Sequence, residues 1–200
     1  MSVVSTDPSV PTRVVIAEDE AIIRMDLREI LEEDGYEVIG ECGNGEDAIA
    51  LVGELEPDLA ILDVKMPVMD GIAAARVITD ERRCAVVLLT AFSQRDLIAQ
   101  ARDAGVMAYV VKPFQRSDLV PAIEIALGRF AEVRELAGKA AELEEALEVR
   151  KLIDRAKGRL TDGHGLSEQD AFAFIQRTAM NERRTIKDVS ADVIAGTLTP

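Results

Sequence analysis

The chain has 200 residues, of which 48% are hydrophobic and 30% are charged, and its net charge is −14. This length suits one medium-sized domain and a smaller one, and the negative charge argues against long-range attraction of the whole protein to nucleic acid or to an anionic membrane. The charge is uneven. Arg150–Pro200 holds 9 basic and 7 acidic residues, a net charge of +2, whereas the preceding residues hold 14 basic and 30 acidic residues, a net charge of −16.

The first twelve residues are polar, include Pro8 and Pro11, and lack the apolar core of a secretory signal. We expect residues 1–12 to form a flexible N-terminus. No apolar run approaches the roughly 18 residues that a membrane span needs, so we expect no association with a membrane. Cys42 and Cys84 lie in apolar, strand-like sequence without metal-ligand spacing, which indicates free thiols in a reducing compartment. These features predict a cytoplasmic protein.

From Val14 onward, short apolar runs alternate with segments whose apolar residues recur at helical spacing. The predicted strands are Val14–Ala17, Glu37–Ile39, Leu59–Leu62, Ala85–Leu89 and Ala108–Val111, and the predicted helices are Ile22–Glu33, Glu46–Leu55, Ile72–Asp80 and Leu97–Ala104. Gly35 and Gly105 mark helix ends, and Ser93–Asp96 has capping-box spacing before the fourth helix. Strands that alternate with helices predict an α/β fold with a five-stranded, doubly wound parallel sheet.

A continuous helical pattern begins at Arg116 and extends to about Leu160. Within it, apolar residues follow one another at intervals of 3, 4, 3 and 4 residues, the spacing of a coiled-coil seam: Val133, Leu136, Ala140, Leu143 and Leu147. The seam is short, and its alanine and neighbouring acidic residues make it weak. Two interpretations stay open, because this stripe could pair with a second copy of the chain or pack against the chain's own C-terminal part.

Two further helices are predicted near the C-terminus, because Ser167–Asp170 and Thr185–Asp188 both have spacing similar to a capping box. The run Gly163-His164-Gly165 predicts a turn before the first of them. We assign His164, the only histidine, to this turn, since no second nitrogen or thiolate ligand lies nearby in the sequence. Of the two aromatic residues here, we expect Phe174 in the core and Phe172 either in the core or shared with a binding surface.

Polar residues follow four of the predicted strands at their carboxyl ends, where an open parallel sheet has its ligand crevice. Glu18 and Asp19 follow the first strand, Asp63 the third, Thr90 the fourth and Lys112 the fifth. Three carboxylates repel one another unless a cation joins them, and oxygen ligands with room for water suit Mg²⁺. A carboxylate can accept a phosphoryl group when a metal ion and an ammonium group neutralise the developing charge. The Thr90 hydroxyl can donate a hydrogen bond to a phosphoryl oxygen.

These residues, the Met66-Pro67-x-x-Asp70-Gly71 turn and Lys112-Pro113 resemble the receiver domain of two-component response regulators over roughly Arg13 to Arg129. The resemblance implies a flavodoxin-like receiver domain at residues 13–128. It also implies that Asp63 accepts a phosphoryl group from a sensor histidine kinase, and that the protein catalyses only its own phosphorylation and dephosphorylation.

The same resemblance implies a role for each residue around Asp63. Mg²⁺ would be held by Glu18, Asp19, Asp63 and the backbone carbonyl of Lys65. Lys112 and Thr90 would assist the reaction, and Thr90 and Tyr109 would form the switch pair. Glu18 departs mildly from the family, which more often has Asp there. A competing interpretation is an aspartyl phosphatase similar to the haloacid dehalogenase type, but such enzymes need a second Asp two residues after the nucleophile, where this chain has Lys65.

Near the C-terminus, Ala156-Lys157-Gly158, Gly165-Leu166-Ser167-Glu168, Ala171-Phe172 and Ala179-Met180 resemble the ANTAR domain, a three-helix RNA-binding unit of antiterminator regulators. Coverage is about Val149 to Ile194, and the family's usual Leu-Met is weakened here to Leu160-Thr161. We assign residues 150–196 to this domain and residues 129–149 to a helical or coiled-coil linker. The resemblance implies binding of RNA hairpins in nascent transcripts, and with it control of transcription antitermination.

Basic side chains in this region can neutralise RNA phosphates, and a helical glycine costs about 1 kcal/mol relative to alanine, so Gly158 calls for a reason. That reason is either close approach to a phosphate or tight packing of a neighbouring helix. The residues that we expect to contact RNA are Arg155, Lys157, Gly158, Arg159, Phe172, Arg177 and Arg184. We expect a homodimer only upon phosphorylation or RNA binding. The alternative function is a receiver whose helical output domain binds another protein or DNA.

Overall fold

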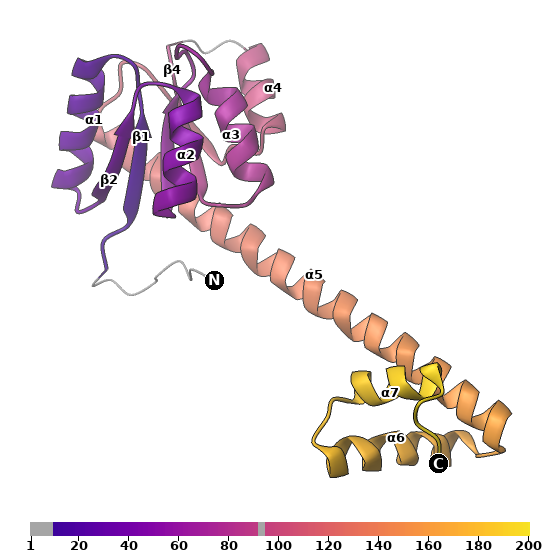
Figure 1. Cartoon of the computed structure of the whole chain (residues 1–200). Coiled ribbons are helices and arrows are strands. Elements are labelled where there is room, and N and C mark those ends of the chain that lie inside the picture. Colours follow the sequence, from indigo (N-terminus) through magenta and orange to yellow (C-terminus); the bar gives the residue numbers. More distant parts are fainter. Residues whose placement is uncertain (1–9, 92–94) are drawn as a thin grey trace. The chain divides into compact units, whose positions relative to one another are not determined.

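The computed structural model describes residues 10–91 and 95–200, with the backbone alone for residues 95–98. The chain divides into two compact units (Figure 1). The first ends at Glu135, and the second comprises Leu136–Pro200. The expectations for residues 1–9 and for a cap at Ser93 lie outside the described residues. No helix in the described part of the chain is both long and apolar enough to cross a membrane.

The first unit is the predicted α/β fold, with a single parallel sheet of strand order β2-β1-β3-β4-β5. The strands are β1 (Arg13–Ala17), β2 (Glu37–Cys42), β3 (Leu59–Asp63), β4 (Ala85–Thr90) and β5 (Ala108–Val111). The helices are α1 (Ala21–Glu33), α2 (Gly45–Leu55), α3 (Gly71–Asp80), α4 (Arg95–Asp103) and α5 (Arg116–His164), of which α5 continues into the second unit. The five-stranded doubly wound sheet is therefore confirmed.

Helices cover both faces of this sheet (Figure 1). Leu27 and Leu31 of α1 pack with Leu119 and Ile123 of α5 on one face, while α2, α3 and α4 cover the other face. Strands β3 and β4 are buried along their whole length and β1 almost so, which explains their continuous apolar sequence. Strand β2 lies at the sheet edge and is only partly buried, so its sequence is not a continuous apolar run. It extends to Cys42, three residues beyond our prediction.

The start of α3 fixes the end of β3. The backbone N–H of Gly71 donates to the carbonyl of Val64 at 3.0 Å, and a Cβ on Gly71 would lie only 2.0 Å from the carbonyl oxygen of Asp63. Glycine is therefore required at this position for close backbone approach, not for an unusual φ. Asp70 caps α3, because its Oδ1 accepts a hydrogen bond from the N–H of Ala73 at 2.7 Å.

In the second unit, the C-terminal part of α5 packs with α6 (Glu168–Glu182) and α7 (Ile186–Ala195). The predicted caps are present, since Ser167 Oγ accepts from the N–H of Asp170 and Thr185 Oγ1 from the N–H of Asp188, both at 3.1 Å. Phe174 packs against the small core, as expected, whereas Phe172 is half-buried outside that cluster. The core of this unit consists of Ala156, Leu160, Ala171, Ile175, Ala179, Val189 and Val193.

One expectation about α5 was wrong, and one of the two interpretations of its apolar stripe is excluded. The helix continues to His164, so Gly163 and His164 are helical and do not form the predicted turn. The stop is set instead by Gly165, whose φ of +67° is the left-handed conformation that favours glycine. The apolar stripe does not pack against the C-terminal helices of its own chain either, because the side chains of Leu136, Leu143 and Leu147 are exposed.

Candidate functional site

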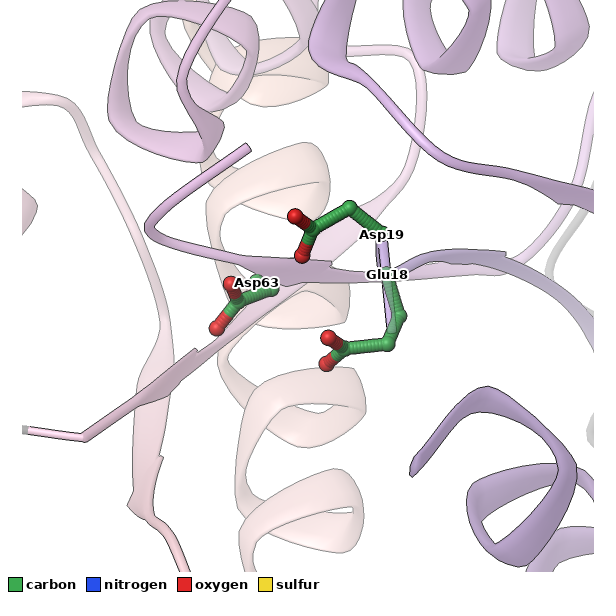
Figure 2. Close-up of side chains that lie close together, drawn as sticks. All are labelled: Glu18, Asp19 and Asp63. Carbon is green, nitrogen blue, oxygen red and sulfur yellow. The ribbon is translucent and has the colours of Figure 1, made fainter. Parts of the chain in front are cut away.

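Three carboxyl groups meet at the carboxyl ends of two neighbouring strands (Figure 2). Glu18 and Asp19 follow β1, and Asp63 is the last residue of β3, which pairs with β1 so that Ala17 lies opposite Leu62. One carboxylate oxygen from each acid lies within 4.8 Å of the others. Glu18 is fully buried, Asp63 is 5% exposed, and Asp19 is open to solvent. The sequence-based expectation that these three acids converge is met by this geometry.

Lys112 brings a positive charge to the same edge. Its Nζ lies 2.6 Å from Oε2 of Glu18 and 2.8 Å from Oδ1 of Asp63. Lys112 follows β5, which is separated from β3 by β4, so its long side chain crosses the end of β4 to reach the acids. Its backbone N–H donates to the carbonyl of Thr90 at 2.7 Å, which fixes the point from which the side chain extends.

Burial and ion pairing act together on the titration of this cluster. Burial raises the pKa of Glu18, and the hydrogen bond from Lys112 offsets only part of that effect. Burial by itself lowers the pKa of Lys112, but the hydrogen bonds to Asp63 and Glu18 and the negative charges of these acids together outweigh burial, and the pKa of the ammonium group is raised. Lys112 is therefore positively charged at neutral pH and compensates part of the charge of two buried acids.

Of the remaining residues of the predicted site, Lys65 contacts Asp63, whereas Thr90 and Tyr109 lie on β4 and β5. The backbone N–H of Lys65 donates to Asp63 Oδ2 at 3.1 Å, and the Lys65 side chain is exposed. Thr90, the last residue of β4, is nearly buried, whereas Tyr109 on β5 is 44% exposed. The two residues of the predicted switch pair thus come from neighbouring strands, one facing inward and the other facing solvent.

One contact in the site was not predicted from the sequence. Nη1 of Arg24 on α1 donates a hydrogen bond to the backbone carbonyl of Glu18 at 2.5 Å. Nothing in the apolar pattern of α1 distinguishes Arg24 from the other charged residues of that helix. The only signal is its position six residues after Glu18, which places it in the first turn of the helix that follows the acids.

The residues expected to contact RNA all lie in the second unit, but they differ in what they already bind. Lys157 Nζ pairs with Asp154 at 2.9 Å and with Glu168 at 3.7 Å. Arg184 pairs with Glu182 at 3.1 Å and with Asp192 at 2.6 Å. By contrast, Arg155, Arg159 and Arg177 are exposed, and the structure gives them no ion pair among the residues it describes.

Gly158 lies in open surroundings. A Cβ built there would meet no atom of another part of the chain within 4 Å. Of the two reasons considered for a glycine at this point, tight packing of a neighbouring helix of the same chain is therefore wrong. Close approach of something outside the chain stays a prediction.

Comparison with known proteins identifies both units. The response regulator receiver domain matches residues 14–124, and the ANTAR domain matches residues 141–194. The chain belongs to the response regulators that carry these two domains. This regulator is 58% identical over 192 residues to the transcriptional regulatory protein PdtaR of Mycobacterium tuberculosis (strain H37Rv), covering 96% of this chain and 93% of that relative. It is also 38% identical over 112 residues to the chemotaxis protein CheY of Thermotoga maritima, covering 56% of this chain and 93% of CheY.

Solved structures show the same receiver fold. The receiver domain of the response regulator NarL from Mycobacterium tuberculosis aligns with a TM-score of 0.57 at 28% identity, covering 59% of this chain and 97% of that one. A CheY-like receiver domain from Methanospirillum hungatei aligns with a TM-score of 0.57 at 25% identity, covering 62% and 98%. Receiver domains generally bind Mg²⁺ at an acidic pocket, and in this regulator the acids Glu18, Asp19 and Asp63 form such a pocket.

The pairing of Lys112 with buried acids makes a prediction about stability without metal. Lys112→Met leaves Glu18 and Asp63 buried without their counter-charge and should lower the free energy of unfolding by about 3 kcal/mol. Adding Glu18→Gln to the same chain removes one of the two buried negative charges that Lys112→Met leaves unpaired. The free energy of unfolding of the double variant should therefore fall by less than the sum of the decreases in the two single variants. Urea unfolding in the presence of EDTA measures these free energies without bound metal. Tyrosine fluorescence reports on the first unit alone, because Tyr36 and Tyr109 are the only tyrosines, both lie in that unit, and the chain has no tryptophan. Strictly additive losses would show that the pair is not coupled.

Proposed function

We propose that this regulator is controlled by phosphorylation of Asp63 and acts on RNA. A sensor histidine kinase donates the phosphoryl group, and the ANTAR domain binds hairpins in nascent transcripts to control transcription antitermination. The observation that carries this proposal is the position of Asp63, almost buried at the end of β3, 2.8 Å from Lys112 and beside two further carboxylates. The chain's only chemistry is then its own phosphorylation and dephosphorylation.

The acidic pocket fits Mg²⁺. Its donors are all oxygens, and Mg²⁺ keeps several water ligands while it binds one or two carboxylates. One carboxylate oxygen from each acid lies within 4.8 Å of the others, so one ion placed among them would have all three acids within reach. Glu18, Asp19, Asp63 and the backbone carbonyl of Lys65 would hold the ion. When bound, Mg²⁺ neutralises charge on the phosphoryl oxygens.

Each side chain around Asp63 has a defined task in this proposal. A carboxylate oxygen of Asp63 attacks phosphorus, the P–N bond of the kinase phosphohistidine breaks, and its electron pair returns to the imidazole. The Lys112 ammonium group, already within reach of Asp63, stabilises the transferred group. The hydroxyl of Thr90 donates to a phosphoryl oxygen, and the half-exposed ring of Tyr109 turns inward as Thr90 moves. This couples the state of Asp63 to the surface of β5.

The phosphorylation proposal is tested with acetyl phosphate as donor. Asp63→Asn should abolish the Mg²⁺-dependent addition of one phosphoryl group, because the amide is a poor nucleophile. Asp103→Asn, which changes an exposed acid on α4, should leave the reaction unchanged. Lys112→Ala should still accept the phosphoryl group, but phosphorylation should no longer produce the regulator's response. Intact-mass spectrometry measures the adduct, and an undiminished Mg²⁺-dependent adduct on Asp63→Asn would refute the assignment of the acceptor.

Three arginines support RNA as the ligand of the second unit. Arg155, Arg159 and Arg177 are exposed, and this unit ends in a stretch of net charge +2 although the remainder of the chain is strongly negative. Lys157 and Arg184 are already paired with acids, so RNA gains less from them. The open surroundings of Gly158 allow a phosphate or sugar to come close to the helix backbone.

A salt titration tests the role of Arg177. Arg177→Ala should weaken the binding of hairpins with different loop sequences by similar factors and reduce the salt slope by about 0.7–0.9, as expected for one lost phosphate contact. Arg102→Ala, which removes the same charge from α4 of the first unit, should change neither quantity. Filter binding measures both. If the intact protein binds no hairpin in any state of Asp63, the helical output binds another protein or DNA instead.

We also propose a homodimer that forms only with phosphorylation or RNA, through the exposed stripe at Leu136, Leu143 and Leu147. The resting protein should be monomeric at micromolar concentration, because so short a seam is marginal by itself. Leu143→Glu should abolish the induced dimer, whereas Ala141→Glu, two positions away and off the seam, should not. Light scattering with and without acetyl phosphate or hairpin decides this, and a tight dimer of the resting protein would contradict it.

A further inference from the structure

The turn that carries the two acids Glu18 and Asp19 is short, and within it the backbone N–H of Glu20 donates to Oε1 of Glu18 at 3.3 Å. Strand β1 ends at Ala17 and α1 begins at Ala21, so three residues connect them. The N-cap residue of α1, Glu20, makes no side-chain capping hydrogen bond, in contrast to the cap residues of α2, α3, α6 and α7. The turn that presents both acids is therefore not fastened by a cap at the start of the helix that follows it.

Arg24 ties the backbone of this turn to α1. The backbone N–H of Glu18 donates to the carbonyl of Cys42 on β2 at 3.0 Å, which holds one side of this peptide. Its carbonyl accepts from Nη1 of Arg24 at 2.5 Å, which holds the other side and ties the turn to α1. Nε of Arg24 lies 3.6 Å from Oε2 of Glu41 on β2, so the guanidinium group is itself held in place.

We infer that Arg24 is a positioning residue that holds the Glu18-Asp19 turn in the geometry that binds Mg²⁺. This inference rests on the proposed Mg²⁺-dependent phosphorylation of Asp63. Arg24 touches neither acid side chain through any contact that the structure gives among its described residues; its contact is with the backbone of Glu18. Its effect on the metal site is therefore geometric, and a partner of this kind typically changes metal affinity by about 10–100-fold.

The charge of Arg24 affects Mg²⁺ affinity in the opposite direction to its contact with the Glu18 backbone. A guanidinium group near the pocket repels a divalent cation, so loss of the charge alone would tighten Mg²⁺ binding. Loss of the positioning contact would weaken it. The sign of the change in affinity therefore separates the two roles.

Arg28 provides a matched control one turn along α1. Its Nη1 pairs with Oε1 of the same Glu41 at 2.6 Å, and its Nε pairs with Glu32 at 2.8 Å. It makes no contact with the acid turn in the part of the chain that the structure describes. Arg28→Ala thus removes an equal charge from the same helix and the same Glu41 cluster while the Glu18 carbonyl keeps its donor.

The test measures Mg²⁺ binding directly in the full-length protein by calorimetry, with no phosphodonor present. Arg24→Ala should raise the dissociation constant about tenfold. Arg24→Lys should restore most of the affinity, because an ammonium group can donate to the same carbonyl, and Arg28→Ala should leave affinity unchanged or slightly tighter. With acetyl phosphate, Arg24→Ala should need more Mg²⁺ for half-maximal rate yet reach nearly the wild-type rate at saturation.

A second measurement needs no metal. In EDTA, amide hydrogen exchange at Glu18–Ala21 should be faster in Arg24→Ala than in the wild type and unchanged in Arg28→Ala. Equal or tighter Mg²⁺ binding by Arg24→Ala, or unchanged exchange at these amides, overturns the role given to Arg24. Failure of the wild-type protein itself to bind Mg²⁺ overturns the proposed function instead, and the exchange comparison then still decides whether Arg24 holds the turn.

Discussion

The first unit depends on one electrostatic constraint: three carboxyl groups meet at one edge of a sheet, and two of them are almost excluded from water. Such an arrangement is unfavourable unless positive charge is brought to it, because buried like charges repel strongly and lose their hydration. Lys112 supplies one positive charge through direct contacts with Glu18 and Asp63. The pocket is still short of positive charge, and that deficit is what makes it suited to a divalent cation and to phosphoryl chemistry.

The surrounding fold keeps these groups from moving apart. Strands β1 and β3 are neighbours in the sheet, so their carboxyl ends carry Glu18, Asp19 and Asp63 side by side. Gly71 lets α3 begin against the carbonyl of Asp63, and helices on both faces fix the strands that bear the acids. Because the acids are held by backbone packing, the charges cannot relax by swinging into solvent. Only Asp19, which is exposed, has that freedom.

The second unit is built differently, since it has a small apolar core and the residues proposed to contact RNA lie in this unit. A charged side chain on a helix surface can pair with other side chains of the fold or stay exposed, and the described residues include both kinds. Lys157 joins α5 to α6 through Glu168, and Arg184 joins the end of α6 to Asp192 of α7. Arg155 and Arg177 are exposed and make no such link in the part of the chain that is described, which is what the proposed contact with RNA phosphates requires.

The sequence by itself determined the elements whose environment is uniform and the residue types at their ends. Strands β1, β3 and β4 were predictable because burial on both faces demands an unbroken apolar run, and Asp63, Thr90 and Lys112 because they stand where such runs stop. The tertiary structure alone decided the length of the edge strand β2, the helical state of His164 and the exposure of Leu143. It also decided that Arg24 reaches back to Glu18. These features depend on which surfaces are covered and on how far a side chain extends in space. The periodicity of a single segment determines neither of these.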